Sequence, residues 1–136
     1  MTQEEKQLLL VDLSARLPYG VKVSKVVGDW TSEPHQIRSI NLNNIIVEDG
    51  EFEDGTPDID VLGYENIKPY LFPLSSMTEE QQEEYYDLCD STLTEWGNPI
   101  WFDSVGSIDW LNKNHFDFRN LICRGLAIDC TNLNIY

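Results

Sequence analysis

The period of the hydrophobic residues changes within the first 27 residues of the chain, and this change limits the possible folds. Four leucines recur on one helical face: Leu9, Leu10, Leu13 and Leu17. Thr2 and Glu5 form a capping box before them, in which the side chain of each residue accepts a hydrogen bond from the backbone amide of the other. After the breakers at 18–20, β-branched residues alternate with polar ones over 21–27. The sequence therefore predicts a helix over 3–17 that leads into a strand.

Short connections follow this first strand. Residues 37–47 predict one or two more strands, broken near Asn43, and 48–60 predicts either a hairpin tip or a mobile loop before the chain returns to the sheet. Such short links favour antiparallel pairing over crossover helices. Two prolines in 64–76 predict an irregular strap instead of a strand.

A second capping box, Thr78 with Gln81, predicts a helix over 78–95 that ends before Gly97. Its apolar arc on a helical wheel holds Tyr85, Leu88, Cys89, Thr92, Leu93 and Trp96. Its opposite arc holds Glu79, Glu80, Glu83, Glu84, Asp87, Asp90 and Glu95. We expect Tyr85, Leu88, Cys89 and Trp96 to pack against a sheet that contains Val21 and Val23.

The C-terminal region predicts a short strand over 100–102, a helix capped by Ser107, and a helical turn over 118–124 that Gly125 ends. At 136 residues, the chain has the usual length of one domain with one core. We therefore expect a single α+β domain over 1–136. It would combine a largely antiparallel sheet with an N-terminal helix, an acidic amphipathic helix and a short C-terminal helical pair.

The sequence also indicates a compartment. The N-terminal residues lack the basic start and cleavage site of a secretory signal, and no apolar run approaches the ~20 residues that cross a bilayer. Cys89, Cys123 and Cys130 form neither a C-x-x-C pair nor a zinc-binding spacing. We expect three reduced, buried thiols in a cytoplasmic protein.

The charge of the chain is concentrated in one segment. The net charge is -15, and residues 48–95 hold 15 acids against one base, Lys68. Nucleic acids and anionic membranes are bound through excess lysine and arginine, so this field repels both and attracts basic surfaces. The sequence predicts no direct nucleic-acid binding, no membrane contact and a basic protein surface as partner. It leaves the oligomeric state open.

The candidate partner-binding residues are the acids of this segment: Glu51, Glu53, Asp54, Asp58, Asp60, Glu79, Glu80, Glu83, Glu84, Asp87 and Asp90. On a strand, alternating acids such as Asp58 and Asp60 repeat every ~6.6 Å, comparable to the spacing along a nucleic-acid backbone. Together with the acidic helix they would imitate a track of phosphates. The alternative is that these acids only keep the surface solvated.

Three blocks of sequence carry a resemblance: LPYGVKV, IKPYLFPLSSMTEEQ, and WLNKNHFDFRNLI followed by GLA. They resemble a family of short, uncharacterised acidic proteins common in gut bacterial genomes and in their phages and other mobile elements. Members tend to carry a base where Phe72 stands and a glycine where Asn120 stands. The resemblance implies a role directed at the host, such as blocking a host or defence protein.

One polar cluster suggests a different function. His115, Asp117 and Arg119 offer a base, a carboxylate and a guanidinium close together, which predicts a small hydrolase or a ligand-binding domain as the enzymatic alternative. Phe116 and Phe118 alternate with them, so the cluster is also typical of a turn pinned to the core. A third possibility is an accessory domain with no electrostatic partner.

No motif predicts a cofactor or a metal. The acidic loop around Gly55 fails the EF-hand pattern in every register, because Phe52 would fall on a ligand position. Dinucleotide-binding, Walker A and zinc-peptidase patterns are absent from the sequence. We expect no cofactor and no metal site.

Overall fold

The computed structural model describes all 136 residues and is built around β1 (Lys22–Val27). This strand lies antiparallel between β3 (His35–Ile40) and β6 (Ile67–Pro73). The strand order is β10-β6-β1-β3-β4-β5. Outside this order, β2 pairs with β1 and β9 pairs with β6. The other strands are β2 (Trp30–Thr31), β4 (Asn44–Glu51), β5 (Pro57–Gly63), β9 (Phe116–Asp117) and β10 (Ile128–Asp129). Only β9 and β10 run parallel to their neighbour, so the expected α+β fold with a largely antiparallel sheet is confirmed.

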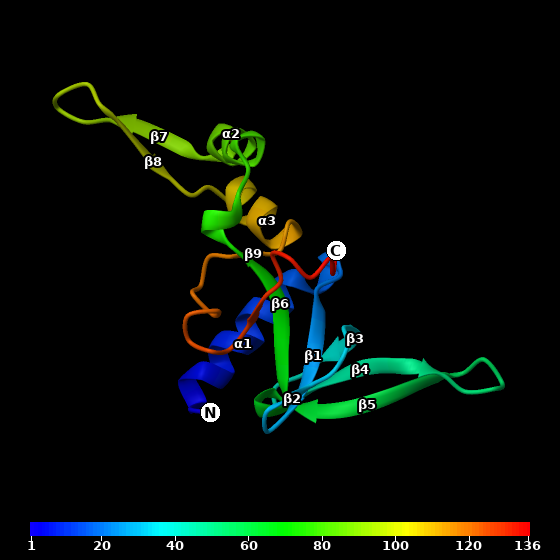
Figure 1. Cartoon of the computed structure of the whole chain (residues 1–136). Coiled ribbons are helices and arrows are strands. Elements are labelled where there is room, and N and C mark those ends of the chain that lie inside the picture. Colours follow the sequence, from blue (N-terminus) through cyan, green and yellow to red (C-terminus); the bar gives the residue numbers. More distant parts are fainter.

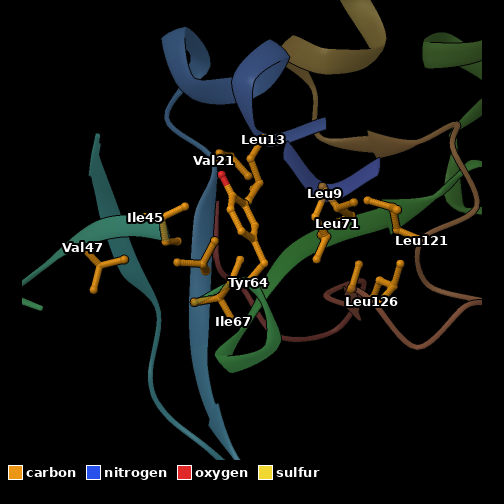
Figure 2. Packing of buried hydrophobic residues seen from close by; sticks show 12 residues of the cluster. Leu9, Leu13, Val21, Ile45, Val47, Tyr64, Ile67, Leu71, Leu121 and Leu126 are labelled. Carbon is orange, nitrogen blue, oxygen red and sulfur yellow. The ribbon is translucent and has the colours of Figure 1, made fainter. Parts of the chain in front are cut away.

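Helix α1 (Gln3–Arg16) packs against the sheet, and η1 (Leu17–Tyr19) ends it. The Thr2–Glu5 capping box is present, as the sequence predicts. Leu9 and Leu13 of α1 are fully buried, and Figure 2 shows them facing Leu71 of β6 and the ring of Tyr64. Burial of each such leucine contributes roughly 1.5–3 kcal/mol. Leu121 and Leu126 close the same core from the C-terminal part of the chain.

The segment 64–76 is not the expected irregular strap. It contains β6, flanked by the short helices η2 (Tyr64–Asn66) and η3 (Leu74–Ser76). A proline lacks the amide that a central strand needs, but each partner strand covers only two or three residues of β6. Pro69 therefore lies at the end of the short pairing of β6 with β1, and Pro73 at the end of its pairing with β9.

Two protrusions leave this core at opposite ends of the molecule (Figure 1). One is the hairpin β4–β5, which confirms the hairpin interpretation of 48–60. The other consists of α2 (Glu79–Leu88) and a two-stranded sheet of β7 (Asp90–Leu93) and β8 (Pro99–Phe102). Helix α3 (Val105–Lys113) lies between α2 and the core.

The prediction of one helix over 78–95 is wrong beyond Leu88. Residues 90–102 form the hairpin β7–β8, whose turn places Gly97 at a φ of 81° and uses the Thr94 hydroxyl to accept two backbone amides. The predicted packing against the main sheet is wrong as well. Helix α2 packs on α3 instead, with Leu88 42% exposed and Trp96 87% exposed.

The C-terminal elements differ in detail from the prediction. Ser104 caps α3, and Ser107 is the third helical residue of the same capping box. The second member of the helical pair is a set of hydrogen-bonded turns that end at Gly125. Asn120 has a φ of 63°, in the left-handed region that favours glycine. Cys123 is exposed, so only Cys130 is the fully buried thiol that we expected.

No helix in the structure is both long and apolar enough to cross a membrane.

Candidate functional site

The protrusion formed by α2 and β7–β8 is strongly acidic along its whole length. We call residues 79–103 the arm. The arm contains eight acids and no lysine, arginine or histidine. None of the residues in α2, β7 or β8 is buried. The whole arm therefore presents a negative field to solvent, extending about a Debye length, ~10 Å at 0.1 M salt.

The acids of the arm have no cationic partner inside the chain, since every ion pair in the structure lies elsewhere. Glu79 and Glu80 lie in the first turn of α2, where the helix dipole favours negative charge. Glu84 accepts a hydrogen bond from the indole Nε1 of Trp110 at 3.2 Å. Glu83 and Asp87 make no side-chain hydrogen bond, so they are free to meet an external cation.

The arm also exposes large apolar side chains. Trp96 and Leu93 are 87% and 69% exposed at the end of the hairpin, and Ile100, Trp101 and Phe102 are all nearly half exposed. A two-stranded hairpin is marginally stable by itself, and exposed apolar clusters on soluble domains mark interaction sites. The arm therefore combines apolar contact area with uncompensated negative charge.

The acids of the β4–β5 hairpin are in a different situation, because several are already used within the chain. Lys25 Nζ lies 2.8 Å from Asp49 Oδ2 and 2.6 Å from Asp60 Oδ2. These bonds raise the pKa of Lys25 against the opposing effect of its burial. Asp54 accepts from the amide and hydroxyl of Thr56 in the hairpin turn. Part of this hairpin's acidity is thus neutralised or structural.

The candidate acids therefore form two groups. The arm holds Glu79, Glu80, Glu83, Glu84, Asp87 and Asp90, the last of them on β7 and not on the helix. The β4–β5 hairpin and its tip hold Glu51, Glu53, Asp54, Asp58 and Asp60. Since the two protrusions point away from each other, the structure does not form the continuous phosphate-like track that we expected (Figure 1).

Aromatic contacts connect the arm to the core, and the sequence did not reveal them. Trp101 of β8 lies against Tyr86 of α2 with ring centroids 5.8 Å apart, and Tyr86 contacts Tyr85 at 5.6 Å. Tyr85 then contacts Trp110 at 5.9 Å, and Trp110 stacks on Phe116 at 5.5 Å. This series of rings fixes the arm on α3 and on the edge of the main sheet.

Asp103 is a further residue that the sequence did not single out. Its Oδ1 accepts a hydrogen bond from the Tyr85 hydroxyl and a longer one, 3.4 Å, from Ser107 Oγ. Burial of the Tyr85 ring, followed by its bonds to Asp103 and Cys89, raises the pKa of Tyr85. The phenol therefore stays protonated and keeps donating to the carboxylate. Asp103 is 18 residues from Tyr85 in sequence, and no local motif links the two.

The second candidate cluster serves contacts within the fold. Both carboxylate oxygens of Asp117 accept backbone amides, from Leu121 and Ile122, at 2.9 Å each. Arg119 donates to Asp12 Oδ1 at 2.6 Å and lies over the ring of Phe118 at 4.1 Å. These two side chains are therefore engaged with α1 and with the turns that follow β9.

His115, the third member of the cluster, is buried and has a φ of 62°. Its ring stacks on Tyr136 with centroids 3.7 Å apart, and its Nδ1 has no hydrogen-bond partner in the chain. Burial, assisted by the positive charges of Arg16 and Lys22, lowers the pKa of His115 to about 4. The imidazole is thus neutral at pH 7, and it packs against the ring of Tyr136 instead of facing an open cleft.

No group of three or more histidine, cysteine, aspartate or glutamate side chains is arranged to hold a metal ion. Comparisons with protein-family models, with curated proteins and with solved structures found no match to this chain. The fold and the arm define an α+β protein with a projecting acidic and aromatic surface.

Proposed function

We propose that this chain is a non-enzymatic interaction protein whose arm docks on a basic site of another protein. The observation that carries the proposal is the arm's composition and exposure: eight acids, no base, no internal ion pair and no buried residue in its helix and strands. Like charges spaced by four residues, such as Glu79 with Glu83, destabilise a helix by a few tenths of a kcal/mol. A surface selected only for solubility usually mixes both signs.

The partner's chemistry follows from this charge. A site rich in lysine and arginine, such as one that normally holds DNA or RNA, complements the arm and would be blocked by it. The resemblance to proteins of phages and mobile elements points to a host or defence protein as the owner of that site. The exposed aromatic residues supply the apolar contacts that charge alone lacks.

Matched charge reversals test the proposal. One variant carries Glu80→Lys, Glu83→Lys and Asp87→Lys on the arm, and the other carries Glu51→Lys, Glu53→Lys and Asp58→Lys on the opposite hairpin. Both change the net charge equally. Tagged wild-type protein and both variants are used to capture proteins from a bacterial lysate, and each captured protein is then purified and tested for direct binding.

The proposal expects loss of binding for the arm variant and retention for the hairpin variant. If the hairpin variant loses the partner and the arm variant keeps it, the docking surface is the β4–β5 hairpin. If both variants bind as the wild type does, neither acidic surface is functional.

A further inference from the structure

A small hollow lies where α2 meets β8, and its walls are mostly aromatic. Tyr85, Tyr86 and Cys89 line it from the helix, and Trp101, Phe102 and Asp103 line it from the end of the hairpin, around a volume of about 190 Å³. A larger hollow of about 400 Å³ adjoins it and shares Tyr85, Tyr86 and Asp103. The smaller hollow lies within the arm, and the larger one lies between the arm and the residues of the core that include Leu111 and Phe118.

One carboxylate oxygen of Asp103, which lines this hollow, has no partner within the chain. Asp103 Oδ1 accepts from Tyr85 and Ser107, whereas Asp103 Oδ2 makes no hydrogen bond within the chain. Tyr85 thereby fixes the carboxylate against the helix. A positioned carboxylate beside the faces of aromatic rings is the arrangement that binds a cation, because rings and carboxylate both attract positive charge.

The arm supplies no cationic side chain to this hollow. The arm contains no lysine or arginine, and none of the ion pairs of the structure involves Asp103. Glu84 and Asp87 on the same helix add to the negative potential around the hollow. We infer that the hollow bounded by Tyr86, Trp101 and Asp103 is an anchor site for an arginine side chain of a basic partner protein.

Arginine fits this hollow better than lysine does. The planar guanidinium stacks on aromatic faces and donates several hydrogen bonds to a carboxylate, whereas the lysine ammonium is a compact and strongly hydrated point charge. Tyr86 and Trp101 are tilted by 58° to one another, so a flat group can lie on one ring while its edge meets the other. The inference rests on the proposed function, since it names the residue type by which a basic partner would be held.

The full chain allows a direct test with small probes. N-acetyl-arginine amide, its lysine counterpart and its uncharged citrulline counterpart are titrated into the protein and followed by NMR, observing the Trp101 indole and the Asp103 amide. We expect saturable shifts at both signals with the arginine probe. The lysine probe should bind about tenfold more weakly, and the citrulline probe should cause no saturable shift.

Variants assign the binding to this hollow. Asp103→Asn keeps an acceptor for the Tyr85 hydroxyl and removes the charge, so it should weaken arginine binding about tenfold. Tyr86→Leu and Trp101→Leu should each weaken it several-fold by removing a ring. Trp96→Leu is the matched control, because Trp96 belongs to the same hairpin but lies in its exposed turn, and it should bind as the wild type does.

The outcomes separate this inference from the proposed function. Equal binding of arginine and citrulline probes, or unchanged arginine binding by Asp103→Asn, overturns the anchor site. If arm charge reversal abolishes partner capture while Asp103→Asn captures normally, the anchor site is wrong and the docking proposal stands. If the arginine probe binds here but no partner depends on the arm, the hollow is an arginine-binding site, and both the docking proposal and the assignment to a partner protein's arginine fail.

Discussion

The guanidinium of Arg16 and the carboxylate of Asp12 form an ion pair that is completely buried within α1, with Nε 2.9 Å from Oδ2. Arg16 also donates to the carbonyl oxygen of Phe116, and Asp12 also accepts from Arg119. This network joins the N-terminal helix to β9 and to the segment after it. Removing Asp12 leaves the Arg16 charge buried without an ionic partner, whereas removing Arg16 leaves Asp12 paired with Arg119 alone.

Asp12→Asn should therefore lower the free energy of unfolding by about 3–5 kcal/mol, and Arg16→Met should cost less because Asp12 keeps its ion pair with Arg119. The double variant should cost less than the sum of the two, because neither buried charge then remains without its partner. Chemical denaturation of the four proteins measures this coupling. Strictly additive losses would show that the two side chains do not act as a pair.

His115 should make the protein sensitive to mild acid. Its pKa is lowered to about 4 in the folded protein, from about 6.5 in an unfolded chain. Well above pH 6.5 both states are neutral. As the pH falls from about 6.5 to about 4, the unfolded state gains a proton that the folded state resists. The folded state should lose on the order of 2–3 kcal/mol over this range.

Denaturation at several pH values tests this prediction. His115→Asn suits the left-handed backbone and removes the titrating ring, so its stability should fall less between pH 6.5 and 4 than that of the wild type. Carboxylates titrate equally in both proteins and cancel in the comparison. Parallel pH profiles would contradict the buried, neutral state of His115.

Asp117 should contribute to stability through the turns that follow it. Asp117→Ala leaves the amides of Leu121 and Ile122 without their acceptors, and should cost about 1–3 kcal/mol. Asp117→Asn keeps one acceptor oxygen and should cost less. Thermal unfolding of both variants measures which of them is more stable. An alanine variant as stable as the wild type would exclude this capping role.

The hairpin β7–β8 should be dispensable for folding. Asp90 and Phe102 are cross-strand partners, so a short Gly-Asn-Gly link in place of residues 91–101 can join them. Because no residue of β7 or β8 is buried, the unfolding free energy should change by less than about 1 kcal/mol. A large loss of stability would mean that the hairpin supports the core.

The sequence was informative where local signals agreed. The capping box at Thr2 and the leucine period defined α1, and the turn-rich acidic stretch defined the β4–β5 hairpin. The helical period gave a wrong prediction after Leu88, because the spacing of residues 90–94 fits both a helix and a strand. The turn formed by Thr94 and Gly97 makes this segment a strand of a hairpin. The buried Asp12–Arg16 pair was missed since charged residues are normally placed at the surface.

The acidic residues of the candidate site were evident from composition, but their distribution was not. Nothing local shows that 48–60 and 79–95 project from opposite ends of the fold, because tertiary contacts of α2 with α3 set their positions. Tyr86, Trp101 and Asp103 likewise come together only through the hairpin register. Sequence patterns carry no information on such long-range contacts unless a known motif links them.

Affinity for a captured partner, measured against salt concentration with and without competing double-stranded DNA, tests the central claim most directly. We predict that the affinity of the wild type falls steeply between about 0.05 and 1 M salt, where the Debye length drops to about 3 Å, and that DNA displaces the partner. The variant with Glu80, Glu83 and Asp87 reversed should not bind at low salt. Equal binding of both proteins, independent of salt and of DNA, would contradict the account.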